Sequence, residues 1–302
     1  MIQLLIDTSY LAHRAHWTTR QLEFDDQPTG VLFGVFNTIL DLAFDRRFLT
    51  NQISFFFDSA QSVRRDAFPE YKRKRFDNKT PEEIEASQII KAQVKRLYRE
   101  ILPAIGFPCY RMRGLESDDL IAQAARQITW AGGKAVIITA DTDLYQCINT
   151  NIEWHDPRKP MVVYNPLNFW AKYEIDPDQW GNVKSLAGCH SDNVPGIPGI
   201  GEARAIDYIM GGKLGARWKS AIESPEGREI LNRNQQLVKL PHLATSILNL
   251  VNPAYNPDVF WQWCEKLGFK SYIDSGKARA WKLFFDGRVN EGVQIPRERK
   301  LV

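Results

Sequence analysis

The sequence predicts an α/β protein with a central, mostly parallel sheet covered by helices, followed by a mostly helical part. Short apolar runs alternate with helical patterns through the first half of the chain, and strands separated by helices form parallel sheets with helices on both faces. After about residue 173 the pattern changes, because Gly, Pro and Asn cluster between residues 188 and 201 and several Trp follow in helical patterns. The 302 residues, 44% of them hydrophobic, suffice for one large core or two unequal domains.

Individual elements are expected where the apolar pattern is strongest. Three buried strands are expected at residues 3–6, 53–57 and 135–139, and helices at 11–17, 31–44, 81–102 and 115–129. The third helix has Pro81 at its N-terminal end, where proline is tolerated.

Composition limits the classes of protein. The longest apolar runs are too short to span a bilayer, and the N-terminus lacks the basic and apolar stretches of a signal peptide. The cysteines argue against a disulfide framework or a structural zinc site, because they lie far apart without a CxxC pair: Cys109, Cys147, Cys189 and Cys264. We therefore expect a cytoplasmic protein.

One short segment is strongly basic although the net charge is only +3. It contains Arg64, Arg65, Lys72, Arg73, Lys74 and Arg75 against Asp66 and Glu70. A cluster of this kind is typical of solvated surface, and contact with nucleic acid is the alternative interpretation.

Acidic residues follow each of the predicted strands. They are Asp7 after the first strand, Asp58 after the second, and Asp141 and Asp143 after the third. A further group, Glu116, Asp118 and Asp119, begins a predicted helix. The carboxyl ends of parallel strands meet at one edge of the sheet, so these acids are expected around one crevice. A single Asp at a strand end is more often a turn residue, and the acids at the helix start also suit the helix dipole.

Seven carboxylates in one crevice would repel each other strongly unless cations were bound among them. An all-oxygen ligand set favours Mg²⁺ or Mn²⁺ over zinc. Two such ions about 4 Å apart can activate a water, hold a phosphate and stabilise the leaving oxygen. The acids therefore indicate hydrolysis of phosphodiester bonds.

The chain resembles the 5′ nuclease superfamily, which includes flap endonucleases, phage RNase H and the 5′-nuclease domain of bacterial DNA polymerase I. Five motifs carry the resemblance in chain order: LLIDTSYLAHRA, FFFDSAQSVRRDAFPEYKRKR, RGLESDDLIAQAA, VIITADTDLYQ and SDNVPGIPGIGEARA. They extend from residue 2 to about 206, and NRNQQLVKL at residues 232–240 is a weaker match. The resemblance implies a PIN-like nuclease core.

The resemblance implies roles for the acids and for the basic segment. The metal ligands would be Asp7, Asp58, Glu116, Asp118 and Asp119 at the first ion, and Asp141, Asp143 and Asp192 at the second. Lys72 would bind the scissile phosphate, Arg75 would neutralise charge in the transition state, and Tyr71 would stack on a base. With Lys72 and Arg75, Asp7, Asp58 and Asp141 form the expected catalytic set. The expected nucleic-acid contacts are Arg14, Arg64, Arg65, Tyr71, Lys72, Arg73, Arg75, Gly196, Gly199 and Gly201.

The resemblance also implies the domain organisation. A catalytic domain would span residues 1–172, with a helical arch at about 64–100, and a helical DNA-binding domain would span 173–302. The latter would contain a helix–hairpin–helix motif at about 185–210, whose Gly-rich turn allows close approach of a DNA phosphate and in relatives often holds a monovalent ion such as K⁺.

One position departs from the family pattern. The family usually has Gly-Asp-x-x-Asp-Asn before the hairpin, whereas Cys189 replaces the first Asp here. Three interpretations remain open: the loss is harmless, it weakens the second metal site so that more Mg²⁺ or Mn²⁺ is needed, or Cys189 and His190 recruit a softer ion.

The leading hypothesis is a metal-dependent 5′→3′ exonuclease, flap endonuclease or RNase H that acts on 5′ flaps or RNA–DNA hybrids in primer or flap removal. A structure-specific DNA-binding protein that has lost cleavage, and a PIN-type ribonuclease, are the alternatives. A monomer with no membrane contact is expected, with replication proteins as candidate partners. It would be free-standing and phage-encoded, acting in the host cytoplasm, since no polymerase domain is attached.

Overall fold

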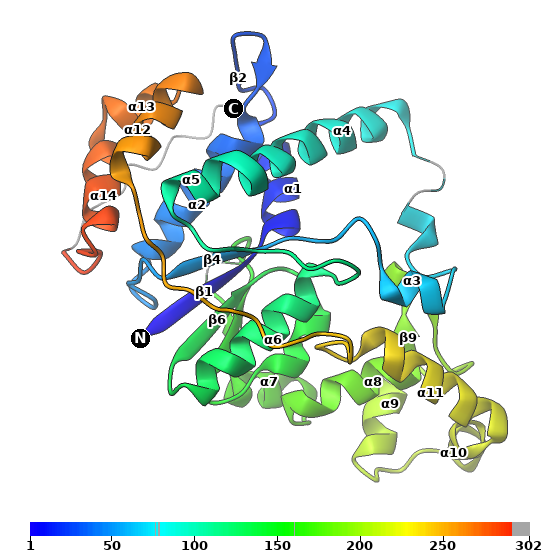
Figure 1. The fold of residues 1–302 in the computed structure, drawn as a ribbon. Coiled ribbons are helices and arrows are strands. Elements are labelled where there is room, and N and C mark those ends of the chain that lie inside the picture. The colour runs from blue at the N-terminus through cyan, green and yellow to red at the C-terminus, as the bar shows by residue number, and fades with distance from the viewer. Residues whose placement is uncertain (76, 78, 160, 292–302) are drawn as a thin grey trace. The chain divides into compact units, whose positions relative to one another are not determined.

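The computed structural model describes residues 1–75, 77, 79–159 and 161–291 and shows two compact units (Figure 1). One unit consists of Met1–Phe57, Pro81–Tyr110 and the segment that begins at Asn249; the other consists of Asp58–Thr80 and Arg111–Leu248. The predicted domain boundary near residue 173 does not coincide with this division, and it stays a prediction. Within the described ranges, no helix is both long enough and apolar enough to cross a bilayer.

The first unit contains three parallel strands in the order β5-β4-β1. These strands are β1 (Ile2–Asp7), β4 (Ile53–Phe56) and β5 (Cys109–Tyr110). Leu4 pairs with Ile53, and Phe55 pairs with Cys109. All four residues of β4 are buried, which explains why its sequence is a continuous apolar run with little alternation.

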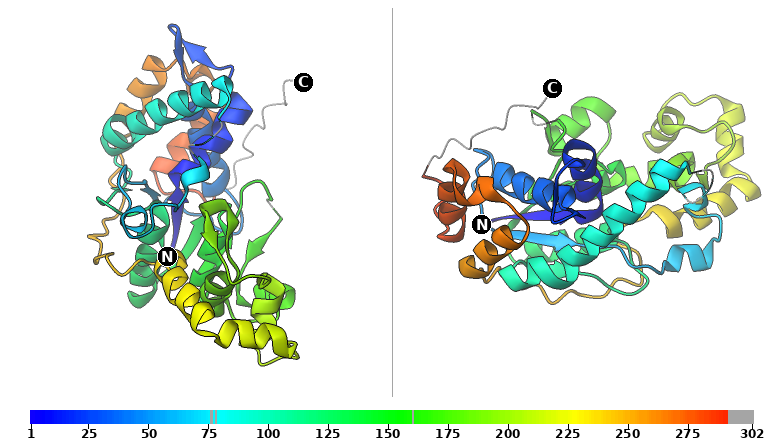
Figure 2. Two further views of the ribbon diagram at one scale, coloured as in Figure 1. Left: turned by 90° about the vertical axis from the view of Figure 1, so that its right-hand side faces the viewer. Right: turned by 90° about the horizontal axis from the view of Figure 1, so that it is seen from above.

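Helices pack together above β1 and β4 in the view of Figure 1. They are α1 (Thr8–Thr19), α2 (Gly30–Ala43) and α4 (Pro81–Arg96), the last continuing through a π-helical turn (Leu97–Ile101) into α5 (Leu102–Ile105). A short hairpin of β2 (Glu23–Phe24) and β3 (Gln27–Pro28) projects beyond α1 and α2 (Figures 1 and 2).

The C-terminal helices complete the core of the first unit. They are α12 (Pro257–Lys266), α13 (Lys270–Ile273) and α14 (Gly276–Phe285). The rings of Phe260 and Trp281 lie 4.4 Å apart, and Phe36 of α2 contacts Trp281 at 5.8 Å between centroids. The last part of the chain thus supplies aromatic core to the unit that contains the first strand.

The second unit contains strands in the order β6-β7-β8. Strand β6 (Lys134–Ile138) pairs in parallel with β7 (Ile152–His155), which pairs antiparallel with β8 (Val163–Tyr164). Helix α6 (Ser117–Trp130) packs on β6. The mostly parallel α/β class is therefore confirmed.

The rest of the second unit is mainly helical. Its helices are α3 (Val63–Ala67), α7 (Pro166–Tyr173), α8 (Trp180–Ala187), α9 (Glu202–Ile209), α10 (Ala216–Glu223) and α11 (Pro225–Val238). Short 3₁₀ turns occupy Arg73–Arg75, Thr142–Cys147, Pro177–Gln179 and His190–Asp192, and β9 (Gly188–Cys189) pairs with β10 (Val194–Pro195). Helix α8 packs against both α9 and α11.

Candidate metal and phosphate site

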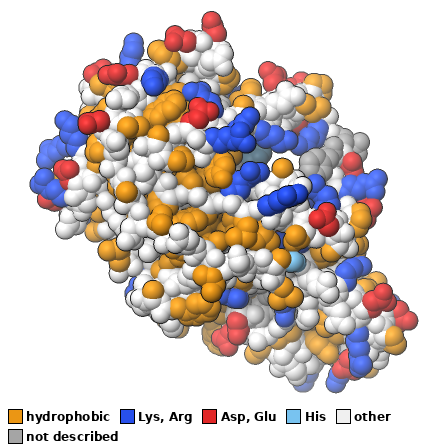
Figure 3. All heavy atoms as spheres, in the orientation of Figure 1, with side chains coloured by type: hydrophobic (Ala, Val, Ile, Leu, Met, Phe, Trp, Pro, Cys, Tyr) orange, Lys and Arg blue, Asp and Glu red, His pale blue; other side chains and the backbone are white. Residues whose placement is uncertain are grey.

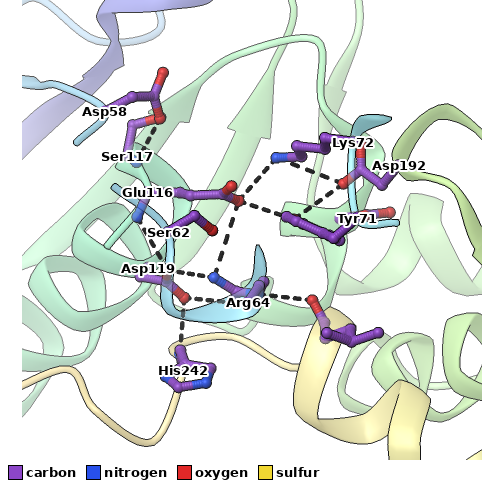
Figure 4. Close-up of polar contacts among 12 residues, drawn as sticks. Asp58, Ser62, Arg64, Tyr71, Lys72, Glu116, Ser117, Asp119, Asp192 and His242 are labelled. Carbon is purple, nitrogen blue, oxygen red and sulfur yellow. Dashed lines mark hydrogen bonds and ion pairs between the residues drawn. The ribbon is translucent and has the colours of Figure 1, made fainter. Parts of the chain in front are cut away.

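The start of α6 arranges three of the predicted acids. Glu116 is the N-cap residue, and its backbone N–H donates to the Asp119 carboxylate at 3.3 Å. Asp118 and Asp119 lie in the first turn of the helix, where the helix dipole stabilises negative charge. Glu116 and Asp119 form a capping box, and the Glu116 carboxylate also lies beside Lys72 and Tyr71 (Figure 4).

Asp119 forms a buried ion pair with Arg64 of α3. The Arg64 guanidinium donates to both Asp119 oxygens, at 2.6 and 2.7 Å, and to the Leu237 carbonyl at 2.7 Å (Figure 4). The two side chains are 2% and 0% exposed. Burial opposes the charge of Arg64, but the hydrogen-bonded Asp119 outweighs it and raises the pKa of the guanidinium.

This pair connects α3 to α6 and involves two predicted site residues. The Arg64 guanidinium, predicted to contact nucleic acid, is buried and hydrogen-bonded within the protein. Both oxygens of Asp119, predicted to bind metal, accept from Arg64. The two predicted roles stay predictions.

Tyr71 reaches the same acids from a hydrophobic cluster. Its ring is 2% exposed and packs with Cys189, Val194, Leu237 and Val238. Its hydroxyl contacts the carboxylates of Glu116 at 2.9 Å and Asp192 at 3.2 Å. Burial, then the charge of Glu116, raises the pKa of this phenol far above its ordinary value. The ring is thus covered by side chains of its own chain, and its stacking on a base stays a prediction.

Lys72 and Arg75 point their charges at the acids. The Lys72 ammonium donates to Glu116 Oε2 at 2.8 Å and lies 3.5 Å from Asp192 Oδ2 (Figure 4). Arg75 donates to Asp192 Oδ1 at 2.7 Å. Burial opposes the charge of Lys72, but Glu116 and Asp192 outweigh it and raise the pKa of the ammonium. The two residues predicted to act on a phosphate therefore lie directly beside predicted metal ligands.

A second group of side chains surrounds Asp143. Ligand atoms of Asp143, Cys189 and Asp192 all lie within 4.8 Å of one another. Burial, then the neighbouring Asp141, raises the pKa of Asp143 to about 7. Lys184 of α8 lies 3.5 Å from Asp143 and pairs with Glu202 at 3.0 Å. The structure thus brings together the residues predicted for the second ion.

Cys189 stands among these acids as a neutral thiol. Its Sγ lies 3.6 Å from Asp143 Oδ2 and 3.1 Å from the Ser191 hydroxyl. Burial, then the charges of Asp143 and Asp192, raises the pKa of the Cys189 thiol to about 12. Compared with the family's aspartate, this residue contributes one negative charge less.

Asp141 and Asp58 are held by local hydrogen bonds. Asp141 caps the 3₁₀ turn that follows β6 by accepting from the Asp143 N–H at 2.8 Å. Asp58 accepts from the backbone and hydroxyl of Ser117, at 2.9 and 3.0 Å. Asp58 is exposed and Asp118 is half-buried. These contacts orient the carboxylates on the second unit.

Two predicted site residues belong to the first unit. Asp7 caps α1 by accepting from the Tyr10 N–H at 3.1 Å, and Arg14 donates to the Thr38 hydroxyl at 3.0 Å. Their participation in a site with the acids of the second unit stays a prediction. The predicted arch at 64–100 also extends over both units, so a passage for a strand stays a prediction as well.

The Gly-rich turn between α8 and α9 requires glycine at three positions. A Cβ on Gly188 would lie 2.3 Å from the Gly196 nitrogen, and one on Gly196 would lie 2.1 Å from the Ala187 carbonyl oxygen. Gly199 has φ of 78°, in the left-handed region, and a Cβ there would collide with Trp218. Gly201 precedes α9 with open space around it. The backbone therefore packs as closely as the predicted hairpin requires.

Arg65 and Arg73, which are also predicted to contact nucleic acid, are more exposed than Arg64. Arg73 is exposed and pairs with Glu70 at 2.8 Å, and Arg65 is half-buried. Figure 3 shows acidic and basic side chains mixed at its lower right, where Figure 1 places α10 and α11. Their contact with nucleic acid stays a prediction.

The residues present fit a divalent cation. Glu116, Asp118, Asp141, Asp143 and Asp192 offer carboxylate oxygens on one unit, which are the ligands that Mg²⁺ and Mn²⁺ prefer. Burial and Asp141 raise the pKa of Asp143 although Lys184 lies 3.5 Å away, so its ionised form would gain from a further positive charge. A bound cation would supply that charge.

Sequence reasoning missed Lys184 and Ser117. Lys184 is only 8% exposed, and the other buried residues of its helix are mostly apolar. A lysine at an apolar position of a helix, shortly before a turn that carries an acid, is a pattern that could have identified it. Ser117 has no comparable signal, because serine is common at helix starts.

An α/β fold with clustered carboxylates, a basic segment and a Gly-rich turn is typical of proteins that act on phosphate esters. Residues 3–174 match the family described as 5′-3′ exonuclease, N-terminal resolvase-like domain. The chain therefore belongs to the 5′-3′ exonuclease family.

Curated relatives include DNA polymerase I of Chloroflexus aurantiacus, 30% identical over 215 residues, and that of Mycobacterium tuberculosis, 32% identical over 213. Each alignment covers 68% of this chain and 22% of the relative, so the chain spans about a quarter of the length of these proteins.

Solved structures share the fold. A bacteriophage T5 5′-exonuclease with bound zinc is 22% identical, with a TM-score of 0.67 over 80% of this chain and 90% of that one. A T5 D15 flap endonuclease in a pseudo-enzyme-product complex with DNA and metal ions is 23% identical, with a TM-score of 0.66 and the same coverage.

Proposed function

We propose that this protein is a structure-specific 5′ nuclease that hydrolyses phosphodiester bonds of DNA or RNA–DNA hybrids near a 5′ end and requires Mg²⁺. The single observation that supports this most is the contact of Lys72 and Arg75 with Glu116 and Asp192. Phosphate-binding cations and metal-binding carboxylates are thereby present at one place, which hydrolysis of a charged ester requires.

Different residues of the chain would bind the metal ions, bind the scissile phosphate and neutralise its charge. Glu116, Asp118, Asp141, Asp143 and Asp192 would hold the divalent ions, which supply Lewis acidity and a water of lowered pKa when bound. Lys72 would bind the scissile phosphate and Arg75 would neutralise its developing charge. The N–H groups at the start of α9 would bind a backbone phosphate of the duplex without reading its sequence.

A second candidate is a DNA-binding protein with little cleavage activity. The observation that favours it is the neutral Cys189 thiol, 3.6 Å from Asp143, where the family usually has an acid. The predicted metal ligands of this unit and the family membership favour the nuclease instead.

One assay separates the candidates. A labelled 5′-flap duplex and an RNA–DNA hybrid are incubated with the protein in Mg²⁺, Mn²⁺ or EDTA, and Asp192→Asn is the matched control. Metal-dependent cutting near the junction that is lost in Asp192→Asn supports the proposal. Tight binding without cutting in either metal contradicts it in favour of the second candidate, and cutting confined to single-stranded RNA indicates a PIN-type ribonuclease.

Other properties stay predictions. They are the balance of flap, exonuclease and RNase H activities, K⁺ at the Gly-rich turn, a monomeric state, replication partners and a cytoplasmic location. Because phosphate contacts dominate such complexes, affinity for DNA should fall steeply with salt.

A further inference from the structure

The acids expected to bind metal already have cations from their own chain. Glu116 Oε2 accepts from the Lys72 ammonium at 2.8 Å and the Tyr71 hydroxyl at 2.9 Å. Asp192 Oδ1 accepts a hydrogen bond from the Arg75 guanidinium at 2.7 Å, and the Lys72 ammonium lies 3.5 Å from Asp192 Oδ2. The charges of Glu116 and Asp192 are therefore balanced by Lys72 and Arg75.

A divalent ion on the same oxygens would conflict with these ion pairs. Two positive groups within about 4 Å of one carboxylate repel each other strongly at the low effective dielectric of a half-buried site. Lys72 and Glu116 are 11% and 12% exposed, so solvent screens this repulsion only weakly. Metal and ammonium are then alternative partners of Glu116.

We propose that Lys72 and Arg75 are the counter-ions of the metal-free site, and that binding of a divalent ion displaces them and makes them available to a phosphate. The inference rests on the proposed function and deepens it. Binding of the metal would release the Lys72 and Arg75 side chains from their ion pairs. The bound metal and the cations that bind phosphate would therefore become available together.

The backbone of the basic segment allows the side chains to exchange while the segment stays docked. The Lys72 N–H donates to the Asp192 carbonyl at 2.8 Å, and the Lys74 N–H donates to Asn193 Oδ1 at 3.2 Å. Lys72 has φ of 56°, a left-handed conformation that is unfavourable for lysine and is maintained by these contacts. Only the long, rotatable side chains of Lys72 and Arg75 need to move.

Not every cation near the acids fits this role. The Arg64 guanidinium is 2% exposed and donates to Asp119 and to the Leu237 carbonyl, so displacing it would leave a buried charge without a partner. Arg75, in contrast, is 51% exposed and can move into solvent at little cost. Of the cations Arg64, Lys72 and Arg75, the last two are therefore the ones that can exchange.

The test measures binding of Mn²⁺ to the full chain without DNA, from the electron paramagnetic resonance signal of free Mn²⁺. Lys72→Met keeps the length of the side chain and removes its charge, and Arg75→Gln does the same at an exposed position. Lys72→Met should bind Mn²⁺ roughly tenfold tighter, because a competing charge is gone from a little-exposed site. Arg75→Gln should bind it about two- to fivefold tighter, because the Arg75 pair is screened by solvent. Arg73→Gln, in the same segment but paired with Glu70, should stay within about twofold of wild type.

Lys72→Arg supplies the rescue, because it retains a positive charge and should keep the wild-type affinity for Mn²⁺. Circular dichroism checks folding; if Lys72→Met fails to fold, Arg75→Gln decides the question. Unchanged or weaker Mn²⁺ binding in the charge-removing variants overturns the exchange while leaving the nuclease proposal to the cleavage assay. Absence of Mn²⁺ binding in wild type overturns both.

Discussion

Two ion-paired regions of the second unit have similar partners but differ in burial. Arg64 contacts Asp119 where both side chains are at most 2% exposed, whereas Arg75 contacts Asp192 with 51% of its side chain exposed. Both arginines belong to the same basic segment, and both acids lie near Glu116. The difference teaches that burial, not the identity of the charged groups, separates a structural ion pair from one that can exchange its partner.

The largest expected effect is on stability at the buried pair. Arg64→Met leaves Asp119 buried without its counter-ion and should lower the free energy of unfolding by about 3–5 kcal/mol. Arg75→Gln should lower it by less than about 1 kcal/mol, since its pair is solvent-screened. Urea denaturation followed by tryptophan fluorescence measures both, and equal losses would contradict the distinction. Adding Asp119→Leu to Arg64→Met should recover part of the loss.

The next effect is on catalysis at the exchangeable group. Lys72→Ala should slow cleavage of a 5′-flap duplex by about 10²-fold, because one contact to the developing charge is lost. Its affinity for the same DNA in Ca²⁺ should fall much less, because many phosphates share the binding energy. Single-turnover rates and fluorescence anisotropy measure the two quantities; a parallel loss in both would remove Lys72 from the cleavage step.

A smaller effect tests the turn that positions Asp192. Gly196→Ala places a Cβ 2.1 Å from the Ala187 carbonyl oxygen and should lower the free energy of unfolding by about 1–3 kcal/mol. The matched Gly201→Ala enters open space, and its effect should stay within about 0.5 kcal/mol. Thermal unfolding distinguishes them. Indistinguishable variants would show that the turn opens more freely than its close contacts indicate.

The smallest expected effect concerns metal demand. Cys189→Asp adds a carboxylate beside Asp143 and should lower the Mg²⁺ concentration for half-maximal cleavage by up to about tenfold. Titration of Mg²⁺ at fixed flap substrate measures this. An unshifted curve means that the thiol is a silent replacement, and cleavage seen only in the Cys189→Asp variant would mean that the natural protein is no working nuclease.

Much of the core could be predicted because its pattern is local. Strands β1, β4 and β6 are predictable because each is a short apolar run, which is the pattern of a strand buried on both faces. Helices α2 and α6 are predictable from the helical period of their apolar residues. Asp143 and Glu116 are predicted to gather because one follows a strand and the other begins a helix, whereas Asp192 is predicted only from the family resemblance. In the structure Asp143 lies near Asp192, and the Tyr71 hydroxyl contacts both Asp192 and Glu116.

The remainder depended on contacts that are distant in sequence. Asp119 has the same local pattern as Asp118, and only the position of Arg64 on α3 shows that its oxygens are engaged. The role of Tyr71 is predicted only from the family resemblance, because a lone aromatic residue has no local signal, and Leu237 and Val238, far along the chain, pack against its ring. Strands β5 and β8 have two residues each, too few for a periodic pattern.

The aromatic helices α12 to α14 impose an order on biosynthesis. Phe36 of α2 contacts Phe260 and Trp281, so it finds them only after residue 281 has emerged from the ribosome. The first unit is interrupted by residues 111–248, which form most of a separate unit with its own strands. The interrupting part can therefore fold during translation, while the apolar face of α2 stays uncovered until α12 to α14 have been made.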